Sequence, residues 1–222
     1  MISFLLPTTR INSHREVFNQ AVMSIRNHHT KGDYEILVYS TDPVEGEDIR
    51  FFQEEEKAGP IKGFNYLLQH AKGDYISVCV DDHQYISSCY PMIEEMESDD
   101  SKYKIRGTSP DGGTIVTPRR NDRLGTTDIE FDVPVIPMIR FPFFRKDCLD
   151  LLNGHIFHPS LYYHAGDIYL SYFLHTMGHR NIEGPTRIAT IQHLKDSGYE
   201  CQDCDVVHDL MKNFDINKGY LQ

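Results

Sequence analysis

The sequence has no long apolar run, and no stretch approaches the roughly 18–20 residues that a transmembrane helix needs. Residues 1–7 also lack the basic region and cleavage site of a secretory signal peptide, and read instead as the first strand of the fold. Hydrophobic residues make up 40% of the 222 and charged residues 25%, which excludes a disordered chain. We therefore expect an ordinary globular protein without a membrane span.

Basic residues are scarce. The chain has 22 Lys and Arg against 33 Asp and Glu, for a formal net charge of −11. This excess of negative charge argues against nucleic acid or an anionic membrane as the main partner. A phosphate-bearing ligand would need a local positive centre, and a divalent metal ion supplies one.

Cysteines are few, and the chain has neither repeats nor linker-like segments. The five cysteines are an odd, scattered set, which does not suggest a disulfide framework and favours a reducing, cytoplasmic location. Low-complexity tracts are also absent. Together these features predict a single domain over residues 1–222.

The first half alternates predicted strands and helices. Apolar runs predict strands at residues 2–6, 34–39, 49–52 and 75–80. Ser13 and Glu16 have capping-box spacing ahead of a helix over residues 17–25, and Gly59-Pro60 opens a second helix that runs to about residue 71. This order predicts an α/β fold, a mostly parallel, doubly wound (Rossmann-like) sheet with helices on both faces.

The second half is less regular. Short helices are predicted at residues 88–96 and 146–152, a fuller helix at 167–177, and short strands at 114–117, 129–138 and 187–192. The polar segment 98–106 is expected at the surface.

A sharp change in polarity marks a candidate site at residues 75–83. The apolar run ends in Asp81, Asp82 and His83. In open α/β sheets ligands bind at the carboxyl ends of the strands, and two carboxylates with an imidazole can hold a hard cation against a phosphate. An Asp-rich turn without a ligand explains the same residues. The local sequence leaves both interpretations open.

Short motifs follow one another along residues 2–195. They are an apolar strand ending in Pro-Thr (2–8), a second strand (35–38), an Asn-bearing helix that leads into Ala-Lys-Gly-Asp-Tyr-Ile (62–76), the strand ending Val-Asp-Asp (75–82), Gly-Asp-Ile-Tyr-Leu (166–170) and Ile-Gln-His (191–193). This ordered set resembles the family 2 glycosyltransferases, which have the GT-A fold and move a sugar from a nucleotide-sugar donor.

The resemblance implies a GT-A-like domain and an activity. Residues 1–83 would form the nucleotide-binding half, residues 84–195 the acceptor-side half, and residues 196–222 a C-terminal tail or helix. The implied function is a metal-dependent, inverting glycosyltransferase of the hexosyltransferase type. Its donor would be a nucleotide-diphosphate sugar, its acceptor a saccharide or another hydroxyl compound, and its cofactor Mn²⁺ or Mg²⁺.

The resemblance assigns Asp82 to the carboxylate that contacts the metal. Asp81 falls at the variable middle position of the acidic motif, and Val80 stands where the first acidic residue is usual. His83 and His193 are candidates for further ligands. Because Mn²⁺ and Mg²⁺ keep several waters and phosphate oxygens, a site with few protein ligands is sufficient.

The nucleotide side is expected on the turns that follow the first strands. The resemblance implies binding residues at Pro7, Thr8, Thr9, Arg10, Ser40, Thr41, Lys62, Asn65 and Asp81. Ser40 and Thr41 stand where relatives often carry a base-contacting Asp, and their hydroxyls can still bond a base. The residues alone also allow Arg10 to pair with a carboxylate.

Asp167 is the candidate general base, which implies single displacement with inversion at the anomeric carbon. Its position before an amphipathic pattern equally predicts a helix N-cap, and the two roles are compatible. Gly166 stands where an acidic residue commonly precedes this Asp.

A zinc site is the alternative assignment of His193. Cys201, Cys204 and His208 have ligand-like spacing and could join it, although a lone CxxC is a weak signal.

Two further clusters allow either a packing or a functional role. Arg119, Arg120 and Arg123 form a dense basic group, either a solvated loop or part of the acceptor side. The aromatic run Tyr162, Tyr163 and His164 can stack on a sugar or simply pack.

Two other functions therefore stay open. The first is a nucleotide-sugar-binding protein of the same fold with weak or no transfer. The second is a small zinc-stabilised interaction domain.

Overall fold

The strand β1 (Ile2–Pro7) forms the centre of the sheet, and all six of its residues are buried. It pairs in parallel with β2 (Tyr34–Ser40) on one side and with β4 (Tyr75–Val78) on the other. β2 continues in parallel to β3 (Ile49–Gln53). A run of consecutive apolar residues is the pattern expected of a parallel strand that is covered on both faces.

The computed structural model describes residues 1–55, 59–108, 139–162, 166–179, 189–191, 204–215 and 219–221. Within these residues the main sheet has the order β3-β2-β1-β4-β7-β6. β7 (Pro142–Arg145) and β6 (Ile105–Gly107) join it antiparallel. β5 (His83–Tyr85) and β8 (Ala189–Ile191) form a separate antiparallel pair. The prediction of a mostly parallel α/β sheet is confirmed.

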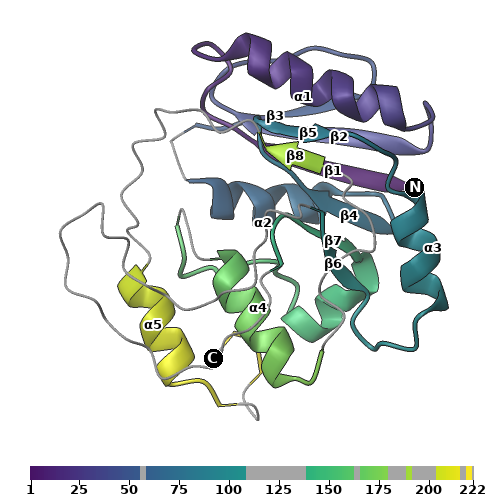
Figure 1. Cartoon of the computed structure of the whole chain (residues 1–222). Helices are drawn as coiled ribbons and strands as arrows, with labels where there is room; N and C mark the ends of the chain where they lie inside the picture. Colours follow the sequence, from purple (N-terminus) through teal and green to yellow (C-terminus); the bar gives the residue numbers. More distant parts are fainter. Residues whose placement is uncertain are drawn as a thin grey trace.

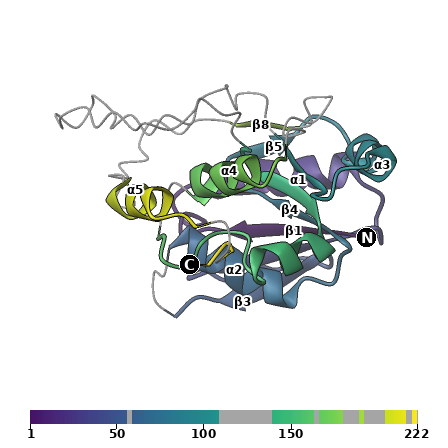
Figure 2. The same ribbon diagram turned by 90° about the horizontal axis from the view of Figure 1, so that it is seen from below.

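Helices cover both faces of this sheet. They are α1 (Arg15–His28), α2 (Pro60–His70), α3 (Tyr90–Ser98), the 3₁₀ helix η2 (Lys146–Leu152), α4 (Gly166–Thr176) and α5 (Cys204–Lys212). Figure 1 shows α1 on one side of the sheet and α2, α4 and α5 on the other. α4 and α5 lie side by side, which is also visible in Figure 2.

The alternation of side chains along each strand divides the core in two. Phe4 and Leu6 of β1 pack in the cluster that contains the buried residues of α1 and α3. Leu5 points to the opposite face and packs with residues of α2 and α4. Successive side chains of a strand point to opposite faces, so one apolar run supplies both cores.

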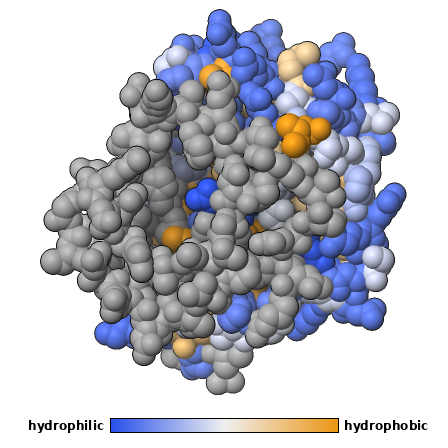
Figure 3. Space-filling view, in the orientation of Figure 1, coloured by the Kyte–Doolittle hydropathy of each residue, from blue (hydrophilic) through white to orange (hydrophobic). Residues whose placement is uncertain are grey.

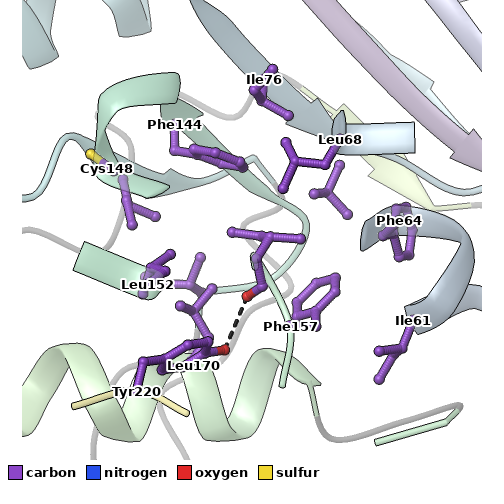
Figure 4. Packing of buried hydrophobic residues seen from close by; sticks show 14 of the residues in the cluster. Ile61, Phe64, Leu68, Ile76, Phe144, Cys148, Leu152, Phe157, Leu170 and Tyr220 are labelled. Carbon is purple, nitrogen blue, oxygen red and sulfur yellow. Dashed lines mark hydrogen bonds between the residues drawn. The ribbon is translucent and has the colours of Figure 1, made fainter. Parts of the chain in front are cut away.

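The second of these cores extends to the C-terminal segment (Figure 4). Tyr220 is fully buried, and its hydroxyl donates a hydrogen bond to the carbonyl of Ile156 at 3.0 Å. The hydroxyl of Tyr169 donates to the carbonyl of Tyr220, also at 3.0 Å. The segment expected as a C-terminal tail or helix therefore contributes a central core residue.

Two expectations from the sequence are wrong. Helix α1 begins at Arg15 after His14 and has no side-chain cap, because the hydroxyl of Ser13 donates to the carbonyl of Arg10 instead. The segment 98–106, expected at the surface, contains the start of β6 and the fully buried Arg106. The Arg106 guanidinium pairs with the carboxylate of Asp99, so its charge is neutralised inside the protein. The strands expected at 114–117 and 129–138 lie outside the described residues.

The face in Figure 3 is mostly hydrophilic where the structure describes it, with isolated hydrophobic residues. Among the residues that the structure describes, the exposed large hydrophobic ones are Met1, Met23, Tyr66, Ile86 and Tyr162. No helix in the described part of the chain has the length and apolar character needed to cross a membrane.

Candidate functional site

Polar residues meet where β1 and β4 end. These strands are parallel neighbours with Leu5 opposite Val78, and the amide of Cys79 donates to the carbonyl of Leu5 at 3.0 Å. The residues that follow each strand are therefore adjacent at the carboxyl edge of the sheet. β1 starts near the chain's N-terminus and runs away from it in Figure 1, so this edge lies on the side opposite the N label.

Asp81 is held by two residues from the turn after β1. The Thr8 hydroxyl donates to Asp81 Oδ2 at 2.6 Å, and Arg10 Nε donates to the same oxygen at 2.9 Å. Arg10 Nη2 contacts Asp81 Oδ1, which completes a two-pronged ion pair. The Arg10 amide donates to the Thr8 hydroxyl at 3.1 Å and fixes the turn. A carboxylate this deeply buried would be costly to desolvate without such partners.

Asp82 is the more accessible of the two acids. Its side chain is 13% exposed, against 5% for Asp81, and its Oδ2 lies 3.7 Å from Arg10 Nη2. The amide of His83 donates to the carbonyl of Val80 at 3.0 Å, so Asp81 and Asp82 occupy a tight turn between β4 and β5. Arg10 therefore faces both carboxylates from one position.

The donor set at Asp82 fits a hard divalent cation. Its carboxylate supplies the oxygen that such cations prefer, and its partial exposure leaves room for waters and for oxygens of a bound ligand. Val80 is partly buried against the α2 side of the core. No group of three or more candidate metal-ligating side chains assembles within the described residues. A cation here would depend largely on water and ligand oxygens.

His83 lies inside the protein and packs against aromatic rings. It is 1% exposed, with its ring centroid 4.7 Å from that of Phe141 and 5.0 Å from that of Tyr85. Its Nε2 lies 3.4 Å from the Thr108 hydroxyl, and burial lowers its pKa to about 3. This histidine is therefore neutral, and it joins the turn after β4 to the ends of β6 and β7.

Ser40 and Thr41 follow β2 at the same edge. Ser40 is fully buried, and its hydroxyl accepts the amide of Asp42 at 3.1 Å. Thr41 is half-buried, and its carbonyl accepts the side-chain amide of Gln53 at 3.0 Å. The Ser40 hydroxyl is thus engaged in its own turn, whereas Thr41 lies closer to the surface.

Pro7 and Thr9 flank Thr8 in the turn after β1. Pro7 is buried and Thr9 half-buried. A Cβ on Gly63 of α2 would lie 2.6 Å from Cβ of Pro7, so only glycine allows α2 to approach this turn. The absence of a side chain at Gly63 thus sets the distance between helix and site.

Lys62 and Asn65 share α2 but differ in environment. Lys62 is exposed in the first turn of the helix. Asn65 is 8% exposed; its Nδ2 donates to the carbonyl of Phe157 at 2.8 Å, and its Oδ1 accepts the amides of Ile156 and Phe157 at 3.2 and 3.3 Å. Asn65 therefore ties α2 to residues 156–157 through the amide group that was expected to meet a nucleotide.

Asp167 lies in the first turn of α4, and this helix start faces the first turn of α2. A Cβ on Gly166 would lie 2.7 Å from the Phe157 ring and 3.2 Å from the Ile61 side chain. That contact places the start of α4 at the carboxyl edge and explains why residue 166 has no side chain. Asp167 is half-buried, and its Oδ1 accepts the amide of Ile168 at 2.9 Å.

Other expected site residues lie outside the described part of the chain. They are His193, Arg119, Arg120, Arg123, Tyr163, His164 and Cys201, together with the side chains of Cys204 and His208. Tyr162 is described: it is 39% exposed, and its carbonyl lies 3.4 Å from the amide of Ile61.

Sequence reasoning missed a polar pair on the rim of the site. The Asn12 amide and side chain donate to the Asp42 carboxylate at 3.3 and 2.6 Å. A usable signal existed, because residues 12 and 42 follow strands that are parallel neighbours. The contact between the Phe141 and His83 rings had no such signal, since the antiparallel addition of β7 creates it.

The chain matches known protein families and folds. The model of the family described as "Glycosyl transferase family 2" matches residues 12–162. No curated protein sequence matches the chain at a significant level.

Several solved structures share the fold at low sequence identity. Staphylococcus aureus TarS 1-349 in complex with UDP has a TM-score of 0.60 at 13% identity, over 98% of this chain and 68% of TarS. The mannosyltransferase PcManGT from Pyrobaculum calidifontis in complex with GDP-Man and Mn²⁺ has a TM-score of 0.58 at 15% identity, over 89% and 58%. GalNAc-T7 with UDP, GalNAc and Mn²⁺ has a TM-score of 0.54 at 16% identity, over 78% and 40%.

Proposed function

Because this chain belongs to glycosyl transferase family 2, we propose that it transfers a sugar from a nucleotide-diphosphate-sugar donor to a hydroxyl acceptor. The observation that supports this most directly is the group of Thr8, Arg10, Asp81 and Asp82 at the carboxyl ends of β1 and β4. A guanidinium and a partly exposed carboxylate at a strand end suit a diphosphate and its counter-cation.

In this proposal Asp82 holds Mn²⁺ or Mg²⁺ against the donor diphosphate. When bound, the ion neutralises charge on the leaving diphosphate. TarS and PcManGT support the choice of donor, because their complexes contain UDP and GDP-Man, the latter with Mn²⁺. We leave His83 out of the ligand set, since its ring packs in the interior. His193 remains a candidate ligand.

We assign nucleotide contacts to the turns after β1 and β2 and to the start of α2. Thr9 and Thr41 are half-buried at this edge, and Lys62 is an exposed cation near it. The turns are supported by three buried side chains, those of Pro7, Thr8 and Ser40. We give Asn65 a structural role and no direct nucleotide contact, because its amide group holds residues 156–157 against α2. Residues 1–83 thus form the donor half, and residues 84–195 supply the acceptor side.

Asp167 is the proposed general base, which takes the proton of the acceptor hydroxyl and implies inversion. Its place in the first turn of α4 suits a negative charge, because a helix N-terminus carries partial positive charge. An ionised carboxylate is the form that a base requires.

Replacement of this carboxylate tests the assignment. We expect Asp167→Asn to lower the rate of sugar transfer by about 10²–10⁴-fold, while the Kd for the donor changes little. The measurement is release of nucleotide diphosphate from UDP- and GDP-sugars, with donor affinity determined in parallel. Asp150→Asn is the matched control, since Asp150 is exposed on η2 at the opposite edge of the sheet. Full transfer by Asp167→Asn would remove Asp167 from the mechanism.

A donor-binding protein without transfer is the second candidate. It is favoured by Gly166, where contact with Phe157 leaves no space for an acidic side chain. Donor that binds but is neither transferred nor hydrolysed would select this alternative.

A further inference from the structure

Arg10 places a positive charge next to Asp82, where that charge would repel a metal cation. Its Nε and Nη2 hold Asp81, and Nη2 is also 3.7 Å from Asp82 Oδ2. That separation exceeds a hydrogen bond, so the attraction to Asp82 is Coulombic and not a fixed contact. The guanidinium is thus anchored at Asp81 and only loosely drawn to Asp82.

We propose that Arg10 is a resident cation that makes divalent-metal binding at Asp82 depend on a nucleotide diphosphate. The inference rests on the proposed function, because it concerns the same donor site. Without the diphosphate, the positive charge of Arg10 repels a second cation from Asp82. With the diphosphate bound, the guanidinium faces phosphate oxygens. The negative charge of the phosphates then offsets the repulsion between Arg10 and the metal ion.

The geometry lets Arg10 turn toward a phosphate while Asp81 Oδ2 keeps its hydrogen-bond partners. Arg10 Nε bonds Asp81 at 2.9 Å, and the Thr8 hydroxyl bonds the same carboxylate at 2.6 Å. Turning the terminal nitrogens toward a phosphate gives up the contact of Arg10 Nη2 with Asp81 Oδ1 and keeps these two bonds to Oδ2. A guanidinium matches phosphate oxygens with two parallel N–H donors, which an ammonium group cannot do.

The charges of the described cluster favour joint binding. Asp81, Asp82 and Arg10 together carry a formal charge of −1, because two carboxylates oppose one guanidinium. A divalent ion alone meets one carboxylate whose charge is already partly compensated by Arg10. A metal and a diphosphate that arrive together bring opposite charges. Coupling between two such ligands is reciprocal and typically lies in the range of about 5- to 150-fold.

The test titrates Mn²⁺ into the protein and measures free Mn²⁺ by electron paramagnetic resonance, with and without UDP or GDP. Arg10→Gln should bind Mn²⁺ alone at least about tenfold more tightly than wild type, and should bind UDP or GDP more weakly. Arg10→Lys keeps the charge and should bind Mn²⁺ alone like wild type. Arg26→Gln is the matched control, because Arg26 forms the same two-pronged pair with Asp48 away from this site.

A merely structural Arg10 predicts a different pattern, in which Arg10→Gln weakens both ligands. Unchanged or weaker Mn²⁺ binding by folded Arg10→Gln therefore overturns the inference. Wild type gives a test that needs no variant: equal Mn²⁺ affinity with and without a nucleotide diphosphate also overturns it. If neither UDP nor GDP binds, the proposed function fails, whereas the titration of Mn²⁺ alone into wild type and Arg10→Gln still decides the role of Arg10.

Discussion

At the scale of single residues, adjacent acids in one turn have different environments. Asp81 is buried and bonded to Thr8 and Arg10, whereas Asp82 is more exposed and its Oδ2 lies 3.7 Å from Arg10 Nη2. Burial suits the first acid to a structural role, and we propose the second as the acid that meets ligands. The sequence pattern Val-Asp-Asp reveals the two acids but not their different environments. That difference depends on Thr8 and Arg10 in the turn that follows β1.

The two acids should therefore respond differently to the loss of charge. Asp81→Asn removes the partner of a partly exposed guanidinium, so we expect the free energy of unfolding to fall by about 1–3 kcal/mol. Asp82→Asn should lower it by less, because the Asp82 side chain is more exposed. Urea unfolding of wild type and the two variants measures both changes in the free energy of unfolding. Equal destabilisation by the two substitutions would contradict the division of roles.

Some residue assignments were within reach of the sequence and others were not. The sequence places Thr8 and Asp82 at the carboxyl edge of the sheet because they follow predicted strands. Asn65 and Gly166 depend on how α2 and α4 meet residues 156–157, and no local pattern reports that contact. Arg106 shows the same limit: a charged residue in a polar segment is buried because Asp99 neutralises it.

At the scale of elements, a buried histidine joins α1 to α3. His29 follows α1, and its Nδ1 donates to the carbonyl of Ile25 at 2.8 Å. Its Nε2 accepts the amide of Cys89 at 3.1 Å, at the start of α3. This pattern requires the neutral ring, and burial lowers its pKa below the ordinary value of 6.5. Protonation would break the link between the helices.

Stability should accordingly depend on pH. The folded-state pKa of His29 lies below the unfolded value, so its contribution is complete above pH 6.5 and is lost as the pH falls below it. We expect a slope of up to about 1.4 kcal/mol per pH unit from this group. Burial also lowers the pKa of His83 and His158, which add to the wild-type slope.

Urea unfolding between pH 7.5 and 5 measures this slope. In His29→Gln the dependence of the unfolding free energy on pH should be weaker by the contribution of one histidine, while His83 and His158 still contribute. An identical slope in wild type and His29→Gln would show that His29 is not the titrating group.

Element boundaries show what apolar periodicity can predict. The parallel strands β1 and β2 and the helix α2 were predicted to within a residue or two, because their apolar runs are uninterrupted. The start of α1 was misplaced, since Ser13 bonds the preceding turn and leaves the helix without a side-chain cap. The antiparallel strands β6 and β7 are only three and four residues long, too short for a clear period.

At the scale of the whole molecule, the fold brings two distant parts of the sequence to one edge. The turns after β1 and β4 supply the proposed donor site, and the contact of Gly166 with Ile61 places the start of α4 at the same edge. An acidic protein with a net charge of −11 thus presents Arg10 and Lys62 at the edge where we propose that the donor phosphates bind. This arrangement of local positive charge is the central feature of the account.

The most direct test is thermal unfolding of wild type and Asp82→Asn with UDP or GDP, in Mn²⁺ and in a chelator. A ligand at about 100 times its Kd adds about 2.7 kcal/mol of stability, or roughly 5–10 °C in Tm for a chain of this size. We predict such a shift for wild type with one nucleotide and Mn²⁺, and a much smaller one in chelator or in Asp82→Asn. No shift with either nucleotide, or an equal shift in Asp82→Asn, would contradict the proposed site.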